Sequence, residues 1–493
     1  MAGLAVRVIY AVAVPGRFND TEHYLDDVAL VLAGRWDAID WYFFQGYFLP
    51  VAPLAALGMS AYAAATIVCF LCALVSGAAI FLLARRLAGP RAGVWAPAAY
   101  ALHPMAAAYA AGSTMETLYG AFFLAGLWLV VSADRPRNLA RGLAGGVCFG
   151  LAGLQRNEGL IFAGALLVGV FALDRWQARA QTPPRRWPAL GMAALGIALV
   201  LVAWMAVFQP RIRGPILFGK TSVNVAVSSP EDKEQWARQR AGVASGVLPP
   251  RPSLAARVGT NARLYPAAMA KMFASPLLVL LPLLAIGWGV ARARREEAML
   301  LLALTGLATF AYLGTAMEYR YLFLGALLSM PLAGAAADAA WRSRGTLVRG
   351  ALVALLPVLL AGGFAVRRWR DEPRGKSSIG AAALLAREVP PQALIYFAFD
   401  RPPEGLGETL RAHAWEHAAL PYVPREEAAS LIPASRDLAF VFVDAYHLDA
   451  FYRDGLFFLS TAPIDVPGAR LEPLGRTTAS ARNPGVLVRL SRR

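Results

Sequence analysis

Long apolar runs separated by short polar segments follow one another along residues 1–370. A helix that crosses a hydrocarbon core of about 30 Å needs about 20 mostly apolar residues, and several runs reach that length. The pattern predicts a polytopic α-helical membrane protein with about 11 transmembrane helices. The expected spans are 2–16, 61–84, 92–110, 114–133, 141–154, 159–173, 188–208, 275–291, 298–315, 320–340 and 350–367.

Residues 371–493 have a different pattern, with short apolar runs between polar segments. ALIYFAF, LAFVFVD, LFFLS and VLVRL are typical of strands, whereas SSIGAAALLAREV and LGETLRAHAWEHAA are typical of amphipathic helices. We therefore expect a small soluble α/β domain after residue 370. The chain shows no internal repeat, which weakens the inverted-repeat signature of many secondary transporters.

Composition agrees with a membrane protein, because 57% of the residues are hydrophobic, 16% are charged and the mean hydropathy is +0.47. The net charge of +16 does not indicate nucleic-acid binding, since the arginines are spread between apolar runs rather than gathered on a polar domain. Cys69, Cys72 and Cys148 lie within apolar helices, so we expect small core- or lipid-facing residues rather than disulfides or a zinc site.

Arginine placement predicts the orientation in the membrane. The segments ARRLAGPRAG, DRPRNLAR, DRWQARAQTPPRRW, ARARREEA and WRSRGTLVR carry three or four arginines each and would share one side. The turns near 111–113, 155–158 and 316–319 contain only Arg156. The positive-inside rule then places the arginine-rich loops in the cytoplasm. Residues 17–60, the loop 209–274 and the tail would lie outside, against the mild opposing signal of RRWR at 367–370.

The stretch RFNDTEHYLDDVALVLAGRW, residues 17–36, gathers four carboxylates in a chain that is otherwise basic and apolar. Asn19 and Glu22 fit a capping box, and an apolar face of Leu25, Val28, Ala29 and Leu32 predicts an amphipathic interfacial helix. Asp20, His23 and Asp27 fall within about 60° of each other on the opposite side of that helix. This second face is either functional or simply solvated.

Further ionisable residues lie at the outer ends of other predicted helices, and we expect them to converge on one site. They are Glu116, Arg156, Glu158, Glu318 and Arg320. Each also has a structural explanation, as a helix-dipole partner for Glu116 and as interfacial ion pairs for the others. His103 precedes Pro104 and is expected to pack at a helix kink, and the tail histidines show no metal-ligand spacing.

Several of these segments, in this order, resemble motifs of the GT-C membrane glycosyltransferases, in particular glycosyltransferase family 39, the protein O-mannosyltransferase and aminoarabinose transferase group. The matching features are Asp20 and Tyr24 in a D-x-x-x-Y pattern, LLARRLAGPRAG, the HP and ETLYGAFF segment, GLQRNEGL and EYRYLFLGALLSMPLAG. The resemblance covers most of residues 1–370 and implies a GT-C fold for that part.

The resemblance also implies site residues. Asp20 matches the family's catalytic base and Glu116 its second acidic position. Arg156 to Gly159 match the family's Arg-Pro-Glu-Gly turn, with Asn157 in place of proline, and Arg320 with Tyr321 matches an Arg-Tyr pair. The full set of expected substrate-binding residues is Glu22, His23, Tyr24, Asp27, Arg156, Glu158, Glu318, Arg320, Tyr321, Arg211, Arg213 and Lys220.

These features predict an inverting glycosyltransferase of the cytoplasmic (inner) membrane, with its active site and tail domain extracytoplasmic. Its partners would be a polyprenyl-phosphate sugar donor, a lipid, glycan or protein acceptor, and the bilayer. No obligatory metal is expected, although Mg²⁺ or Mn²⁺ use is compatible with the family. The alternatives are a transporter or flippase of lipid-linked sugars, and a scaffold whose tail is a binding module.

Overall fold

The computed structural model describes most of the predicted helices and much of the tail. Its described ranges are 19–36, 46–133, 138–178, 186–212, 253–273, 295–314, 319–342, 381–397, 407–420, 425–444, 457–477 and 485–493, with a few isolated residues between them. The chain divides into two compact units: residues 1–226 with 253–366, and residues 227–252 with 367–493. The first unit is helical, and the second contains a β-sheet.

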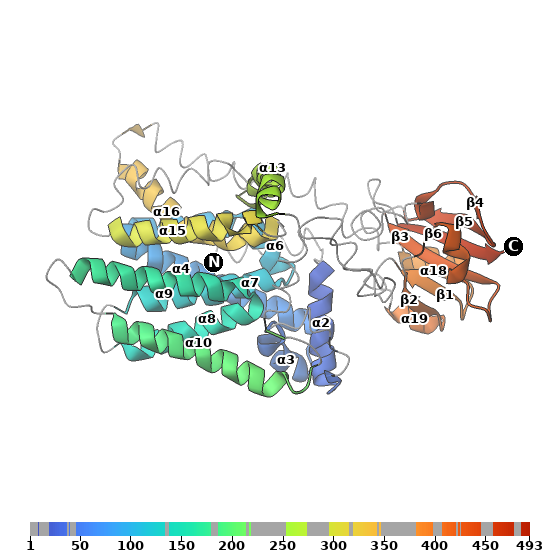
Figure 1. The fold of residues 1–493 in the computed structure, drawn as a ribbon, viewed down its shortest axis with the longest axis horizontal. Helices are drawn as coiled ribbons and strands as arrows, with labels where there is room; N and C mark the ends of the chain where they lie inside the picture. Colours follow the sequence, from blue (N-terminus) through green and yellow to red (C-terminus); the bar gives the residue numbers. More distant parts are fainter. Residues whose placement is uncertain are drawn as a thin grey trace. The chain divides into compact units, whose positions relative to one another are not determined.

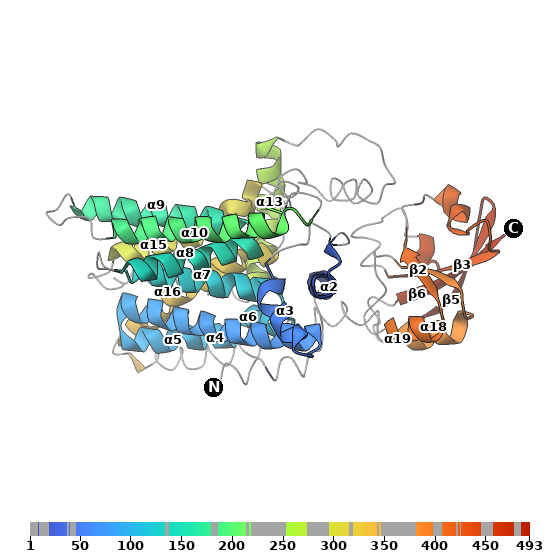
Figure 2. The same cartoon turned by 90° about the horizontal axis from the view of Figure 1, so that it is seen from below.

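The first unit is a bundle of apolar helices (Figure 1). Its elements are α2 (Asn19–Leu32), α3 (Phe48–Ala56), α4 (Ala61–Ala88), α5 (Pro90–Leu102), α6 (Pro104–Ala111), α7 (Met115–Val131), α8 (Leu139–Gln155), α9 (Glu158–Ala178), α10 (Trp187–Phe208), α13 (Leu254–Phe273), α15 (Arg295–Phe310), η3 (Ala311–Gly314), η4 (Tyr319–Leu322) and α16 (Phe323–Arg342). Helices α4, α8, α9, α10 and α15 run side by side, whereas α2 lies across their ends (Figures 1 and 2).

Five described helices are long and apolar enough to cross a membrane, and a sixth span results if α6 and α7, bent by 114°, are counted together. The five are Ala61–Ala88, Glu158–Trp176, Trp187–Phe208, Glu296–Leu313 and Arg320–Arg342. The predicted polytopic membrane fold is confirmed, and the chain is a multi-pass membrane protein. The predicted number of 11 spans is not confirmed, because the spans 2–16, 275–291 and 350–367 lie outside the described ranges.

The single span predicted over 92–110 is wrong. Helix α5 ends at Leu102, and His103 is extended with φ −69° and ψ 116°. As expected of a packed residue at a helix break, His103 caps α6: its Nδ1 accepts a hydrogen bond from the Ala106 backbone N–H at 3.2 Å. Pro104 then begins α6, since proline at the first helical position lacks only an N–H that has no partner within the helix.

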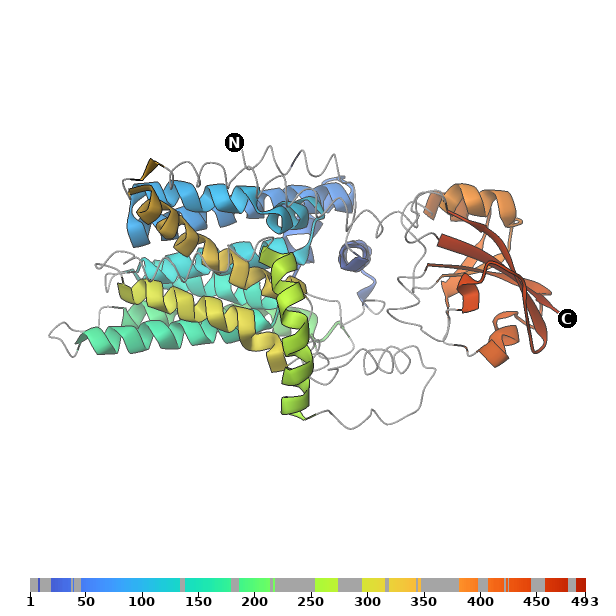
Figure 3. The ribbon, with the colours of Figure 1, turned by 90° about the horizontal axis from the view of Figure 1, so that it is seen from above.

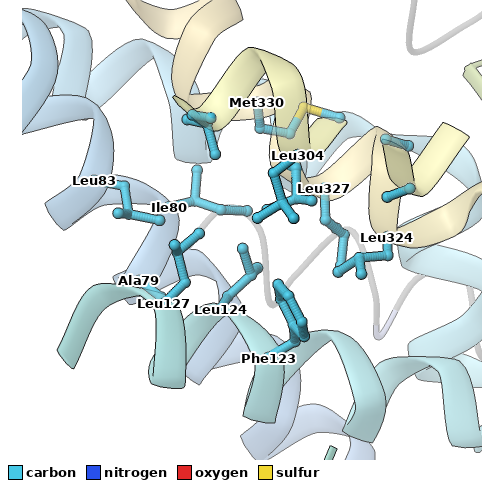
Figure 4. Close-up of a cluster of buried hydrophobic side chains, with 14 of the residues drawn as sticks. Ala79, Ile80, Leu83, Phe123, Leu124, Leu127, Leu304, Leu324, Leu327 and Met330 are labelled. Atoms are coloured by element: carbon cyan, nitrogen blue, oxygen red, sulfur yellow. The ribbon is translucent and has the colours of Figure 1, made fainter. Parts of the chain in front are cut away.

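Helices α4, α7, α15 and α16 contribute to the main hydrophobic core. Figure 4 shows their side chains interdigitating around Ile80, Phe123, Leu304 and Leu327, all buried. On the other side of the bundle, α8 and α10 approach through small residues. A Cβ added to Gly146 would lie 2.0 Å from the Ala193 carbonyl oxygen, so this contact excludes any larger side chain.

The second unit holds a six-stranded sheet in the order β2-β1-β3-β6-β5-β4. The strands are β1 (Leu394–Phe397), β2 (Glu416–Ala419), β3 (Leu438–Asp444), β4 (Ile464–Val466), β5 (Ala469–Arg476) and β6 (Gly485–Arg492), with helices α18 (Ala381–Glu388) and α19 (Gly407–Ala412) and the 3-10 segment η5 (Arg425–Leu431). Strand β1 pairs in parallel with β2 and β3, and the remaining pairs are antiparallel. Two apolar clusters pack on this sheet.

The α/β character of this unit confirms the sequence prediction. Two of the elements predicted for it were wrong. The segment LGETLRAHAWEHAA is not one helix, because α19 ends at Ala412 and EHAA forms β2 beside β1. Residues 457–459 of LFFLS form a short 3-10 turn rather than a strand. In both segments tertiary pairing overrides local propensity.

Candidate functional site

A buried ion cluster joins the starts of α7 and α9. Glu116 lies in the first turn of α7, and Arg156 lies at the break between α8 and α9 in an extended conformation. Arg156 Nη1 contacts Glu116 Oε1 at 3.1 Å, and Nη2 contacts Glu158 Oε1 at 3.4 Å. The Arg156 and Glu116 side chains are 7% and 5% exposed. With all three groups ionised, the cluster carries a net negative charge.

Aromatic residues from distant helices surround this cluster. The Arg156 guanidinium lies 4.4 Å from the centre of the Tyr321 ring, and that of Arg320 lies 5.8 Å from the same ring. The buried hydroxyls of Tyr119 and Tyr312 have no hydrogen-bond partner within the described part of the chain. Buried polar groups are normally paired, so these hydroxyls are free to bond to a polar molecule entering the site.

The turn between α8 and α9 depends on a glycine. A Cβ on Gly159 would lie 2.9 Å from Tyr119 Cε2. The missing side chain therefore lets the start of α9 lie against the Tyr119 ring, next to Glu158. This close approach is a physical reason for the glycine in the segment RNEG.

Helix α13 lies across the end of the bundle (Figure 3) and is bonded to the segment that carries Tyr312. Asn261 Nδ2 donates hydrogen bonds to the carbonyl oxygens of Tyr312 and Leu313, at 3.4 and 2.8 Å. The Tyr265 hydroxyl donates to the Thr309 carbonyl at 2.6 Å. These bonds hold the end of α15 and η3, and with them Tyr312, beside Arg156.

The connection from α6 to α7 is strained and fully buried. Ser113 has φ +53°, a left-handed conformation that non-glycine residues rarely adopt. The Tyr47 hydroxyl donates to the Ser113 carbonyl at 2.5 Å, and the Ser113 and Thr66 hydroxyls lie 2.8 Å apart. Tyr24 of α2 contacts Tyr47, with ring centroids 5.2 Å apart. A line of contacts thus links α2 to the turn that precedes Glu116.

Helix α2 forms as predicted, but its buried face differs from the predicted one. Leu25 and Val28 are buried, whereas Ala29 and Leu32 are exposed. Asp27, expected on the polar side, is only 4% exposed. Burial raises the pKa of the Asp27 carboxyl to about 8. Tyr24 supplies much of the difference, because its large ring lies on the side that packs on Tyr47.

Comparisons with known proteins agree with this architecture. Residues 48–205 match the sequence model of the dolichyl-phosphate-mannose-protein mannosyltransferases. The structure resembles ArnT from Cupriavidus metallidurans bound to undecaprenyl phosphate, with a TM-score of 0.57 and 14% identity over 98% of this chain and 96% of that one. The chain has the GT-C fold. The predicted resemblance to GT-C glycosyltransferases is thereby confirmed.

Two other solved GT-C structures are also similar. One is the apo oligosaccharyltransferase from Archaeoglobus fulgidus, with a TM-score of 0.55 and 13% identity over 90% of this chain and 69% of that chain. The other is the arabinofuranosyltransferase AftD from Mycobacteria, with a TM-score of 0.50 and 16% identity over 99% of this chain and 39% of that chain. No curated protein sequence matches the chain significantly.

The GT-C fold brings five of the predicted site residues together: Glu116, Arg156, Glu158, Arg320 and Tyr321. Arg211 is not among them. Its side chain is exposed, its Nη1 donates to the Val207 carbonyl at 2.7 Å, and its guanidinium lies 5.7 Å from the Trp36 ring.

The remaining predicted residues are only partly described or not described. Asp20, Glu22 and His23 lie in α2, but their side chains are outside the described part of the structure. Glu318, Arg213 and Lys220 lie outside it altogether. Their roles stay predictions.

Sequence reasoning missed Tyr119 and Tyr312. Tyr119 had a signal, since it lies three residues after Glu116 and therefore on the same face of α7. Tyr312 had none, because only the packing of α13 and η3 places it near Arg156.

A metal site is not evident within the described ranges, where no three His, Cys, Asp or Glu side chains are placed to hold an ion. The cysteines there are free, with Cys69 buried and Cys72 and Cys148 half-buried. The expectation of a metal-independent reaction stays a prediction.

Proposed function

We propose that this protein is an inverting glycosyltransferase that transfers a sugar from a polyprenyl-phosphate donor to a hydroxyl acceptor. The observation that carries the proposal is the buried cluster of Glu116, Arg156 and Glu158 at the helix ends of a GT-C fold. A lipid-linked donor stays in the bilayer while its headgroup meets water, so this reaction requires a polar site at the ends of membrane helices.

The donor class is supported by the fold similarity to ArnT bound to undecaprenyl phosphate. Within the site, Arg156 is already neutralised by two glutamates and is a poor partner for a phosphate. We therefore assign phosphate binding to Arg320, with Arg211, Arg213 and Lys220 as further cations of the same outer region. Glu116, Glu158 and the free tyrosine hydroxyls are better suited to the hydroxyls of a sugar or acceptor.

In the proposed reaction Asp20 acts as the general base. The acceptor hydroxyl loses its proton to the Asp20 carboxylate, and its oxygen forms a bond to the anomeric carbon. The bond from that carbon to the phosphate oxygen breaks, and its electron pair leaves with the lipid phosphate. Attack opposite to the leaving group inverts the anomeric configuration. A positioned base contributes typically about 10²- to 10⁴-fold to such a reaction.

We place the site at the extracytoplasmic face of the inner membrane, because the arginine-rich loops belong at the other ends of the same helices. The second unit, from residue 367 on, would then share that face and help select a lipid, glycan or protein acceptor.

A transporter or flippase is less consistent with the charge distribution. A transport pathway needs polar groups near the bilayer midplane. In the described membrane helices, charged residues lie in the terminal turns, as Glu116, Glu158 and Arg175 do, and the central turns are apolar. This distribution suits a reaction at one face.

The test is transfer of labelled sugar from polyprenyl-phosphate donors to lipid, glycan and protein acceptors by the purified full chain. We expect Asp20→Asn to lose most transfer without loss of folded protein, and the product to have the opposite anomeric configuration to the donor. Asp26→Asn is the matched control, since it removes a carboxyl from the same helix. Near-normal transfer by Asp20→Asn would show that Asp20 is not the base. If the wild-type protein transfers no sugar from any donor, the result would favour a flippase.

A further inference from the structure

Asp27 of α2 is buried, but its carboxyl makes no described hydrogen bond that would hold the helix in place. Its Oδ2 atom has no hydrogen-bond partner within the described part of the structure, and its side chain is almost fully buried. Its helix neighbours Tyr24, Val28 and Val31 belong to an apolar cluster shared with α3 and α4. Burying a carboxyl oxygen without a hydrogen-bond partner costs free energy, so we expect an apolar residue at this position to be more stable.

The described surroundings of Asp27 disfavour its charged form. Among the described side chains of this apolar cluster, the titratable ones are Tyr24, Tyr47, Tyr62, Cys69 and Cys72. The described members of this cluster include no Lys, Arg or His that would compensate a carboxylate. Since burial raises the pKa to about 8, most Asp27 side chains carry an O–H at pH 7. Asp27 is then a hydrogen-bond donor rather than an anion.

The location of Asp27 connects it to the candidate site. Tyr24, one turn before it, packs on Tyr47, whose hydroxyl holds the turn that precedes Glu116. Asp20 lies seven residues earlier in α2, which places it two turns away on the same side of the helix backbone. Trp36, shortly after the same helix, lies under the guanidinium of Arg211. In the sequence, Asp27 thus lies between Asp20, the proposed base, and Trp36, the residue that packs on Arg211.

We propose that Asp27 binds substrate as a neutral carboxylic acid, donating a hydrogen bond to a phosphate oxygen of the lipid-linked donor. This inference rests on the proposed function for the identity of the donor. The hydrogen bond strengthens as the glycosidic bond breaks, because negative charge then grows on the phosphate oxygen. The proton stays on Asp27 throughout, so the step needs no additional acid. An ionised Asp27 would instead repel the phosphate.

The test measures binding of undecaprenyl phosphate to the full chain in nanodiscs, for wild type, Asp27→Asn and Asp27→Leu at pH 6.5 and pH 9. Asparagine keeps a neutral donor, so we expect its affinity at pH 6.5 to fall only a few-fold. Leucine removes the donor and should weaken binding by about 10- to 100-fold, as expected for a hydrogen bond to a charged group. Relative to Asp27→Asn, wild type should lose affinity at pH 9 as Asp27 ionises.

Thermal unfolding distinguishes binding from a structural role. We expect Asp27→Leu to unfold at a higher temperature than wild type while binding more weakly, because it removes an unpaired buried carboxyl. A structural role would instead lower the unfolding temperature. Asp26→Asn, about 100° around the helix from Asp27, is the matched control for both measurements.

Three outcomes would overturn the inference: leucine binding as tightly as wild type, asparagine losing as much affinity as leucine, or wild type and asparagine sharing one pH dependence. The proposed function is tested separately by sugar transfer. Transfer without Asp27-dependent binding would refute this inference alone, and binding without transfer from any donor would refute the proposed function alone.

Discussion

Buried arginine–carboxylate clusters lie at both ends of the helical bundle, and their bonding differs. At the end opposite to Glu116, Arg86 makes two bonds of 2.8 Å to Glu297, one to each carboxylate oxygen. Arg186 contacts the same glutamate at 3.3 Å. Its backbone N–H donates to Asp174 Oδ2 at 3.0 Å, and its Nε forms an ion pair with Asp174 Oδ1 at 3.7 Å. Two cations there meet two anions, and each carboxylate oxygen has a partner.

At the Glu116 end, one arginine meets two glutamates, and the nearby hydroxyls of Tyr119 and Tyr312 have no described partner. The strained Ser113 and the unpaired Asp27 lie at this end too. A saturated network stabilises helix ends, whereas an unsaturated one retains bonding capacity for a ligand. Both clusters are buried and charged, and they differ in the bonding of their carboxylates and of the hydroxyls around them.

The largest expected effect comes from a substitution in the cluster of Arg86, Arg186, Glu297 and Asp174. Glu297→Gln removes the carboxylate that both Arg86 and Arg186 contact, so we expect the free energy of unfolding to fall by about 3–5 kcal/mol. Transfer per folded molecule should stay close to wild type. Thermal unfolding in detergent and sugar transfer measure the two quantities. Lost turnover in protein of unchanged stability would show that this end takes part in the reaction.

The second effect tests the unsaturated cluster. In Glu116→Gln, Arg156 keeps Glu158 as a partner, so we expect the free energy of unfolding to fall by less than in Glu297→Gln, where two arginines lose a shared carboxylate. Transfer should fall by about 10²-fold, since removing one preorganised polar group from a reaction site has that order of effect. Steady-state kinetics and unfolding curves on the same preparations check both. A stable variant with full activity would make this cluster merely structural.

The third effect is a pH dependence of stability. The pKa of Asp27 is raised on folding, so between about pH 4 and pH 8 the unfolded chain loses this proton while the folded chain keeps it. Stability should therefore fall as pH rises through that window, because only the unfolded chain releases this proton there. The difference between wild type and Asp27→Asn isolates its contribution. Parallel curves for the two proteins would mean that Asp27 is ionised in the folded state.

The smallest effect concerns the strained turn. Tyr47→Phe removes the hydroxyl that donates to the Ser113 carbonyl, and we expect to lose about 0.5–1.5 kcal/mol of stability. Transfer should fall by more than this loss of folded protein explains, because the turn holds Glu116 in place. Tyr62→Phe provides the comparison, since Tyr62 packs on the edge of the same apolar cluster. Equal effects of the two substitutions would count against a role for the turn.

Much of the fold could be predicted from the sequence. The helices α4, α7, α8, α9 and α10 match predicted spans closely, because continuous apolar runs have few alternatives in a membrane. Boundaries set by tertiary contacts were less predictable. The His-Pro pair at 103–104 predicted a kink, but the extended break there also depends on the His103 side-chain cap. Strand β2 depends on pairing with β1, which leaves no distinct pattern in the local sequence.

The sequence by itself determined the membrane character, the separate α/β unit and the charged residues worth following, Glu116, Arg156 and Arg320 among them. These follow from hydropathy and from the rarity of ionisable groups near hydrocarbon. Only the tertiary structure decided which carboxylates each arginine pairs with, that Tyr312 lies near Arg156, and that Asp27 faces the core. Pairing and burial depend on residues far apart in the chain, and periodicity within one helix cannot tell which face its neighbours cover.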